Sequence, residues 1–202
     1  MRNVAGIAIV AILASIGWES APAAQGKPIR TVKDGVLDQI KLYVEKPPSA
    51  VRAAMKPFSG EGIQGDSEET KKMKVDAPGL LAERFVLKLK ELGPFTDISS
   101  LAAGASPAAD ALVVEGKFTE MDPGSRTKRY LVGFGAGKSG VSVQGSVKSA
   151  EGTVLAEFEQ RRIGVMGVAG GNSLDKLTSD TRDIGEDIAK FLSVWAKGQK
   201  LN

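Results

Sequence analysis

Alternation of apolar and polar residues predicts β-strands along much of the chain. In the stretch LDQIKLYVE every second residue from Ile40 to Val44 is apolar, and the Pro-Pro pair that follows cannot donate to a strand ladder and ends the run. Further strands are predicted at 94–99, 111–121, 127–134, 140–149 and 154–164. The last two are expected to form a hairpin, because Gly152 supplies the positive φ that a short turn needs.

Two segments carry apolar residues at the three- and four-residue spacing of a helix. The first, 76–93, begins with Asp76 as N-cap, has Pro78 in its first turn and ends at Gly93, which suits a left-handed C-cap. The second begins near Ser173 and is expected to close the core rather than to act as a detachable arm. Its apolar stripe consists of Leu174, Leu177, Ile184, Ile188, Phe191 and Trp195.

The order of these elements predicts an α+β fold, with a mainly antiparallel sheet and helices packed on one face of a single domain. Residues 49–75 have weak signals, and we assign them a helical turn at 49–55 followed by a loop. The domain is predicted to span 36–197. It follows a flexible N-terminal tether at 24–35 and precedes a C-terminal tail at 198–202.

The N-terminal segment 1–23 has the three parts of a secretory signal peptide. A basic start at Arg2 precedes a short apolar run, and Ala21 and Ala23 stand at the spacing that signal peptidase recognises. The apolar run is shorter than the ~20 residues of a membrane-spanning helix, so cleavage before Ala24 is predicted, with an uncleaved anchor as the alternative. The protein is therefore expected to be exported, with at most peripheral membrane contact.

Composition restricts the available chemistry. The 202-residue chain has no cysteine and no histidine, and its net charge is +3. Without these residues we expect no disulfide, no lipid on a cysteine, no zinc site of the usual ligands and no serine–histidine or cysteine–histidine catalysis. Export without disulfides favours a bacterial periplasm. The small net charge gives no basis for nucleic-acid binding, and no cofactor or metal is expected.

Carboxylate pairs, oxygen-ligand metal sites and serine–lysine dyads remain as possible sites. Lys138 and Ser139 are neighbours, and neighbours in a strand point to opposite faces, so they are not expected to form a dyad. Glu157 and Glu159 share one face of a predicted strand, which we interpret as a solvated edge. The same is expected of three acidic residues in the last helix, Asp183, Glu186 and Asp187.

The stretch GFGAGKSG, residues 133–140, resembles part of a phosphate-binding loop but has the wrong spacing. The motif requires a glycine five positions before the glycine that precedes its lysine. Counting back from Gly137 leads to Val132, which is not glycine. A strand pattern rather than a helix follows, so no nucleotide binding is expected.

Several short motifs resemble those of an uncharacterised protein family. They are DPGSR, RYLVGFGAGKS, GTVLAEFEQRR and the glycine-rich GVMGVAGG before the last helix. Together they resemble domain of unknown function 4410, found in exported bacterial proteins of which many are lipoproteins, over about residues 110–192. The resemblance implies a cell-envelope location and no assigned enzyme activity, and it supplies no catalytic residues. This chain departs from the lipoproteins because it has no cysteine to carry a lipid.

Glycines concentrate between Gly133 and Gly171, in two segments that also contain large apolar residues. One interpretation is that these segments bend the sheet and bury their apolar side chains under the helices. The other is an exposed patch with a basic rim, for a partner protein or the membrane surface. This patch would consist of Arg126, Lys128, Arg129, Tyr130, Leu131, Phe134, Val165 and Met166.

Two classes of function remain open at this point. The first is a non-catalytic module that binds an envelope protein or helps to assemble an outer-membrane complex. The lack of catalytic side chains and the family resemblance favour it. The second is a small-ligand carrier or an enzyme with a carboxylate- or serine-based site, which a pocket holding two close carboxylates of raised pKa would favour. We expect the first, without enzyme activity and without a nucleotide or nucleic-acid ligand.

Overall fold

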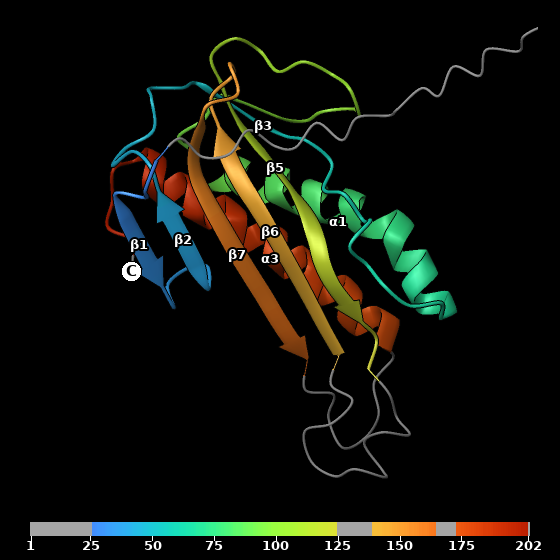
Figure 1. Ribbon diagram of the computed structural model, residues 1–202. Helices are drawn as coiled ribbons and strands as arrows, with labels where there is room; N and C mark the ends of the chain where they lie inside the picture. The colour runs from blue at the N-terminus through green and yellow to red at the C-terminus, as the bar shows by residue number, and fades with distance from the viewer. Residues whose placement is uncertain (1–25, 125–138, 165–172, 202) are drawn as a thin grey trace, which may run out of the picture.

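The computed structural model describes residues 26–124, 139–164 and 173–201. They form one seven-stranded sheet with two long helices on one of its faces (Figure 1). The strands are β1 (Arg30–Lys33), β2 (Gln39–Leu42), β3 (Arg52–Met55), β4 (Asp97–Ser100), β5 (Ala111–Asp122), β6 (Ser139–Lys148) and β7 (Val154–Gly164). The helices are α1 (Glu68–Leu92) and α3 (Ser173–Ala196). The predicted α+β class is confirmed.

The sheet is mixed but mainly antiparallel, with the strand order β1-β2-β7-β6-β5-β3-β4. Among the described strands, β3 pairs in parallel with β4 and with β5, and the other pairs are antiparallel. The predicted hairpin is β6–β7, and Gly152 in its turn has a φ of 93°. Three long strands, β5, β6 and β7, therefore form the centre of the sheet in front of both helices (Figure 1).

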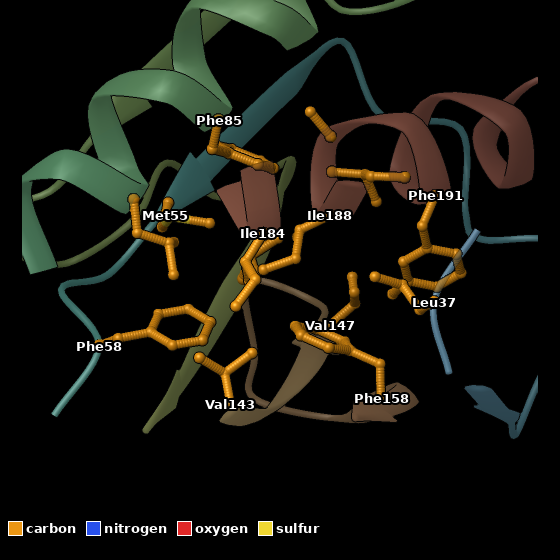
Figure 2. Packing of buried hydrophobic residues seen from close by; sticks show 14 of the residues in the cluster. Leu37, Met55, Phe58, Phe85, Val143, Val147, Phe158, Ile184, Ile188 and Phe191 are labelled. Atoms are coloured by element: carbon orange, nitrogen blue, oxygen red, sulfur yellow. The ribbon is translucent and has the colours of Figure 1, made fainter. Parts of the chain in front are cut away.

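The core lies between this sheet and the helices. Figure 2 shows Phe85 of α1 and Ile184, Ile188 and Phe191 of α3 on the side facing the strand residues Val143, Val147 and Phe158. The predicted stripe of α3 is confirmed, because the side chains at its centre are at most 1 % exposed: Leu177, Ile184, Ile188, Phe191 and Trp195. Burial of each such side chain stabilises the fold by ~1.5–3 kcal/mol.

The two helices also pack tightly on each other. Gly185 of α3 lies so close to α1 that a Cβ added there would be 2.4 Å from the carbonyl oxygen of Leu81. Near the C-terminal ends, Ser193 Oγ donates a hydrogen bond of 2.8 Å to the carbonyl oxygen of Gly93. On the outer surface, Arg84 Nη2 lies 2.9 Å from Glu186 Oε2. Glu186 is therefore ion-paired rather than free in solvent, contrary to prediction.

Helix α1 begins at Glu68, well before the predicted start at Asp76. Its N-cap is Ser67, whose side chain accepts a hydrogen bond of 3.1 Å from the backbone N–H of Thr70. Pro78 consequently lies inside the helix. Met73, which is fully buried, anchors the added N-terminal turns on the core, a contact that the sequence did not reveal. The predicted C-cap at Gly93 is confirmed, with a φ of 63°.

Residues 52–55 were expected to be helical, and this prediction is wrong. They form β3, which lies between β5 and β4 in the sheet. Ala53, Ala54 and Met55 are all buried. Alanine and methionine favour helices in isolation, but pairing with a strand on each side outweighs this weak preference.

Both ends of the described chain belong to the domain. The segment predicted as a tether contains β1, which pairs with β2. Within the predicted C-terminal tail, Leu201 is 3 % exposed, and its carbonyl oxygen accepts a 3.4 Å hydrogen bond from Arg30 Nη2. Residues 30–33 and Leu201 therefore contribute to the fold. Within the three described ranges, neither helix is apolar enough over its length to cross a membrane.

Candidate binding site on the open face of the sheet

The face of the sheet opposite the helices carries polar side chains in transverse rows. Successive side chains of a strand alternate between the two faces, and directly paired residues of neighbouring strands share a face. One row consists of Lys41, Glu157, Ser146 and Glu115, from β2, β7, β6 and β5. The next row consists of Gln39, Glu159, Gln144 and Lys117 from the same strands. Strand register therefore collects residues from distant parts of the chain.

These two rows line a groove of about 750 Å³. Its remaining wall comes from the segment after β3, which contributes Lys56, Pro57 and Ser59. A hollow of this size lies within the range of small-molecule sites, ~300–1,000 Å³. Charged and amide groups stand among apolar carbon atoms of the lining, so charge and hydrogen bonds would orient a ligand here.

Two glycines of the groove, Gly116 and Gly145, pair directly with each other in the centre of the sheet. A Cβ at Gly145 would lie 2.4 Å from Cζ of Phe158, and one at Gly116 would lie 2.6 Å from Cε1 of Phe58. Both rings belong to the core (Figure 2). The glycines are therefore required because aromatic rings pack directly against the strand backbone.

Glu115 forms the best-connected charge cluster of the groove. Its carboxylate lies 2.5 Å from Lys148 Nζ and 3.1 Å from Lys56 Nζ. Burial would raise the pKa of Glu115, but the hydrogen bonds from Lys148 and Lys56 outweigh it, so this pKa lies below its ordinary value. The Glu115 carboxyl group is ionised at neutral pH, and one carboxylate is shared by two ammonium groups.

The glutamates of β7 have neutral partners instead. Glu157 Oε2 accepts a 2.8 Å hydrogen bond from the Tyr43 hydroxyl, and burial together with this carboxylate raises the pKa of Tyr43. Glu159 Oε1 accepts a 3.3 Å hydrogen bond from Gln144 Nε2. Neither glutamate has a lysine or arginine within ion-pair distance among the described residues. Glu157 and Glu159, predicted as a solvated edge, therefore line one side of the groove.

Charge is unevenly distributed across the groove. On the side of β5 and of the segment after β3, Lys56 and Lys117 outnumber Glu115, which gives a formal charge of +1. On the side of β7 and β2, two glutamates face Lys41, which gives −1. Between them, the polar side chains that β6 contributes to the lining are the neutral Gln144 and Ser146, while Lys148 at the end of β6 is buried beside Glu115. The groove is thus dipolar, with its axis perpendicular to the strands.

A second polar cluster lies on the helix side of the sheet, and it shows that the prediction for Asp187 was wrong. Asp187 of α3 is 6 % exposed and pairs with Arg162 of β7, while Gln160 Nε2 donates a 3.3 Å hydrogen bond to the same carboxylate oxygen. Asp187 was expected in solvent, but Gln160 and Arg162 of β7 face the helix, and their contacts with Asp187 keep its carboxylate buried. Since a buried carboxylate needs partners, this cluster fixes α3 on β7.

The patch predicted from the sequence lies outside the described residues. This applies to all eight of its members: Arg126, Lys128, Arg129, Tyr130, Leu131, Phe134, Val165 and Met166. Lys138 lies outside them as well, and the strand predicted to follow it is confirmed as β6. The patch stays a prediction. Across ranges 26–124, 139–164 and 173–201, no group of acidic side chains is arranged to hold a metal ion.

Residues 39–168 match the family described as Domain of unknown function (DUF4410). The chain is a member of the DUF4410 family. The matched region extends from the start of β2 to beyond the end of β7, so every strand that lines the groove of this DUF4410 domain lies within it. The family resemblance inferred from the sequence motifs is confirmed.

Two solved structures resemble the fold of this DUF4410 domain. They are the PelC dodecamer from Paraburkholderia phytofirmans and a leucine-to-methionine variant of it. Their sequences are 14% and 16% identical to this chain, and the matches cover 74% of it and 95% and 96% of the PelC chains, each with a TM-score of 0.47. No curated protein matches the sequence. A similarity this distant assigns no activity, so the function must be argued from the domain itself.

Proposed function

We propose that this DUF4410 domain is a non-catalytic binding module of the cell envelope, and that it holds a partner in the groove on the open face of its sheet. The observation that carries the proposal is the groove of about 750 Å³, which is lined by charged and hydrogen-bonding side chains from β2, β5, β6 and β7. A hollow of this kind across the middle of a sheet offers a contact area in which charged and amide groups are distributed among apolar atoms.

The state of the carboxylates supports binding rather than catalysis. An enzyme that uses two carboxyl groups needs one of them protonated, which requires a raised pKa. The pKa of Glu115 is lowered instead, because Lys148 and Lys56 stabilise its ionised form. Glu157 and Glu159 accept hydrogen bonds from Tyr43 and Gln144, which orient their carboxylates. Glu157 and Glu159 are therefore suited to hold a cationic or hydrogen-bonding group in place.

The N-terminal sequence supports the envelope location. Its basic start, short apolar run and Ala21-Pro22-Ala23 exit have the form of a signal peptide. Sequencing of the mature N-terminus from a periplasmic extract should begin at Ala24. Recovery of a chain that still starts at Met1 would contradict export by cleavage.

Site-specific photo-crosslinking in cells tests the binding surface. A photoreactive phenylalanine analogue replaces Gln144, which is exposed in the groove, or Glu83, which is exposed on α1. We expect an adduct with an envelope component from position 144 and none from position 83. The variant Ser146→Arg, whose long side chain would fill the groove, should remove this adduct without changing the thermal midpoint by more than ~2 °C.

Two outcomes would refute the proposal. The first is that the same adduct forms from position 83, because binding would then not depend on the groove. The second is that the adduct at position 144 persists unchanged when Ser146→Arg blocks the groove in a folded protein.

A further inference from the structure

The groove has three zones of different charge, which follow one another across the sheet. Glu157 and Glu159 of β7 form an acidic zone, Gln144 and Ser146 of β6 form a neutral zone, and the third zone is basic. The basic zone combines Lys117 of β5 with Lys56 from the segment after β3, and these two lysines outnumber Glu115. A ligand that matches all three zones must have a cation at one end, hydrogen-bonding groups in the middle and an anion at the other end.

The separation of the charged zones sets the length of such a ligand. Neighbouring strands lie ~4.8 Å apart, so β7 and β5, which flank β6, are about 10 Å apart. An extended chain of three amino acids spans about 10 Å. In a free tripeptide the ammonium and carboxylate groups therefore lie at about the distance between Glu159 and Lys117 in the same row.

We propose that the groove binds a short peptide with free ends, three or four residues long, which lies across the strands. Its ammonium group contacts Glu157 and Glu159, its carboxylate contacts Lys117 and Lys56, and its amides bond to groups on β6. This inference rests on the proposed binding function and specifies its ligand.

The charged groups of the groove are available for such a ligand. Lys117 forms no ion pair with any described residue, and the partners of Glu157 and Glu159 are neutral. Each of these groups can therefore gain a partner of opposite charge without losing one. Lys41 lies opposite Glu157 in the register and reduces the negative charge of that zone, but two glutamates against one lysine leave it acidic.

Alanine tripeptides with different ends test the inference on the full-length mature chain. The four probes are trialanine, N-acetyl-trialanine, trialanine amide and the doubly blocked peptide. Binding is followed at low ionic strength by amide chemical shifts, up to about 10 mM peptide, because exposed charge pairs are weak and screened by salt. We expect trialanine to shift the signals of Gly116, Gln144 and Gly145, and each blocked end to weaken binding by about threefold to fivefold.

Variants assign each end of the peptide to one side of the groove. In the variant Glu159→Gln, trialanine should bind about threefold more weakly, and N-acetylation of the peptide should no longer weaken its binding. In the variant Lys117→Gln, trialanine should also bind about threefold more weakly, and amidation of the peptide should no longer weaken its binding. The matched controls Glu83→Gln and Lys90→Gln remove one charge of each sign from the exposed side of α1, and they should leave binding unchanged.

Equal binding of all four peptides, or no shift with any of them, would overturn the peptide inference. If the crosslink at position 144 persists in that case, the groove still binds a partner and only the ligand class is wrong. If that crosslink is also absent, the proposed function fails together with the inference.

Discussion

Replacement of Gly185 by alanine should destabilise the protein although alanine is the better helix former. A glycine-to-alanine change inside a helix normally gains about 0.5–1 kcal/mol. At Gly185, however, the new Cβ would lie 2.4 Å from the carbonyl oxygen of Leu81 and 3.3 Å from the backbone nitrogen of Phe85. Both atoms belong to the backbone of α1, which cannot turn away as a flexible side chain can. The two helices would have to separate.

The cost of this separation exceeds the gain in helix propensity. Overpacking of a core contact costs about 1–3 kcal/mol. The side chains of Leu81 and Phe85 are fully buried, so movement of α1 also disturbs its contacts with the sheet. Because both clashing atoms belong to the backbone, the upper part of this range, about 2–3 kcal/mol, applies, and subtraction of the propensity gain leaves a net loss of about 1–2.5 kcal/mol. For a domain of this size the loss corresponds to a decrease in the melting temperature of about 2–10 °C.

Gly79→Ala provides the matched control in the other helix. Gly79 is exposed in α1, and an added Cβ would have no atom within 4 Å. This variant should gain about 0.5–1 kcal/mol. Urea unfolding followed by circular dichroism measures both changes. If Gly185→Ala stabilised the protein as much as Gly79→Ala, the close approach of α1 and α3 at this point would be refuted.

Three further changes test the core and its charges. Phe191→Ala should cost about 3–5 kcal/mol in urea unfolding, because the ring is fully buried and stacks on Trp195 with centroids 5.6 Å apart; a loss below ~1 kcal/mol would show that α3 is not part of the core. Arg162→Met should cost about 2 kcal/mol, because Asp187 then keeps only Gln160 and the more distant Lys190 as partners, and the added change Asp187→Leu should restore most of the loss. If the double variant is no more stable than the single one, loss of the pair between Arg162 and Asp187 is not the cause of the destabilisation. The pKa of Glu115 is lowered on folding. The ionised Glu115 carboxylate therefore stabilises the fold above the ordinary pKa of 4.5, and this effect is lost as pH falls through the lowered pKa. Glu115→Gln should flatten the dependence of the free energy of unfolding on pH in this range, and an unchanged slope would contradict the prediction.

The elements with a strong local pattern could be predicted from the sequence. Alternation identified β5, β6 and β7, and the stripe of α3 was recognised residue by residue, from Leu177 to Trp195. In each case one face of the element is buried and the other is polar, so the periodicity of burial is visible in the chain itself. The turn at Gly152 and the helix end at Gly93 were also predictable, because both require a positive φ.

Elements whose identity depends on distant partners were predicted wrongly. The short segment from Arg52 to Met55 has no alternation, since three of its four residues are buried, and it is a strand because β4 and β5 pair with it on either side. The early start of α1 likewise depends on the burial of Met73. The conformational preferences of these residues contribute less free energy than the tertiary contacts that the residues gain. Those contacts are made with distant residues, so the local sequence does not reveal them.

The candidate site likewise has one part that the sequence predicted and another that only the tertiary structure revealed. Sequence alone showed that no site of this chain can use histidine or cysteine, and it placed Glu157 and Glu159 on one polar face. Only the tertiary structure brought Lys117 and Gln144 into the same row as Glu159, and Lys56 beside Glu115. The register between β5, β6 and β7 is set by the packing of the opposite face on the helices, where a shift by one residue would expose the core. The polar groove is therefore positioned by apolar contacts on the other side of the sheet.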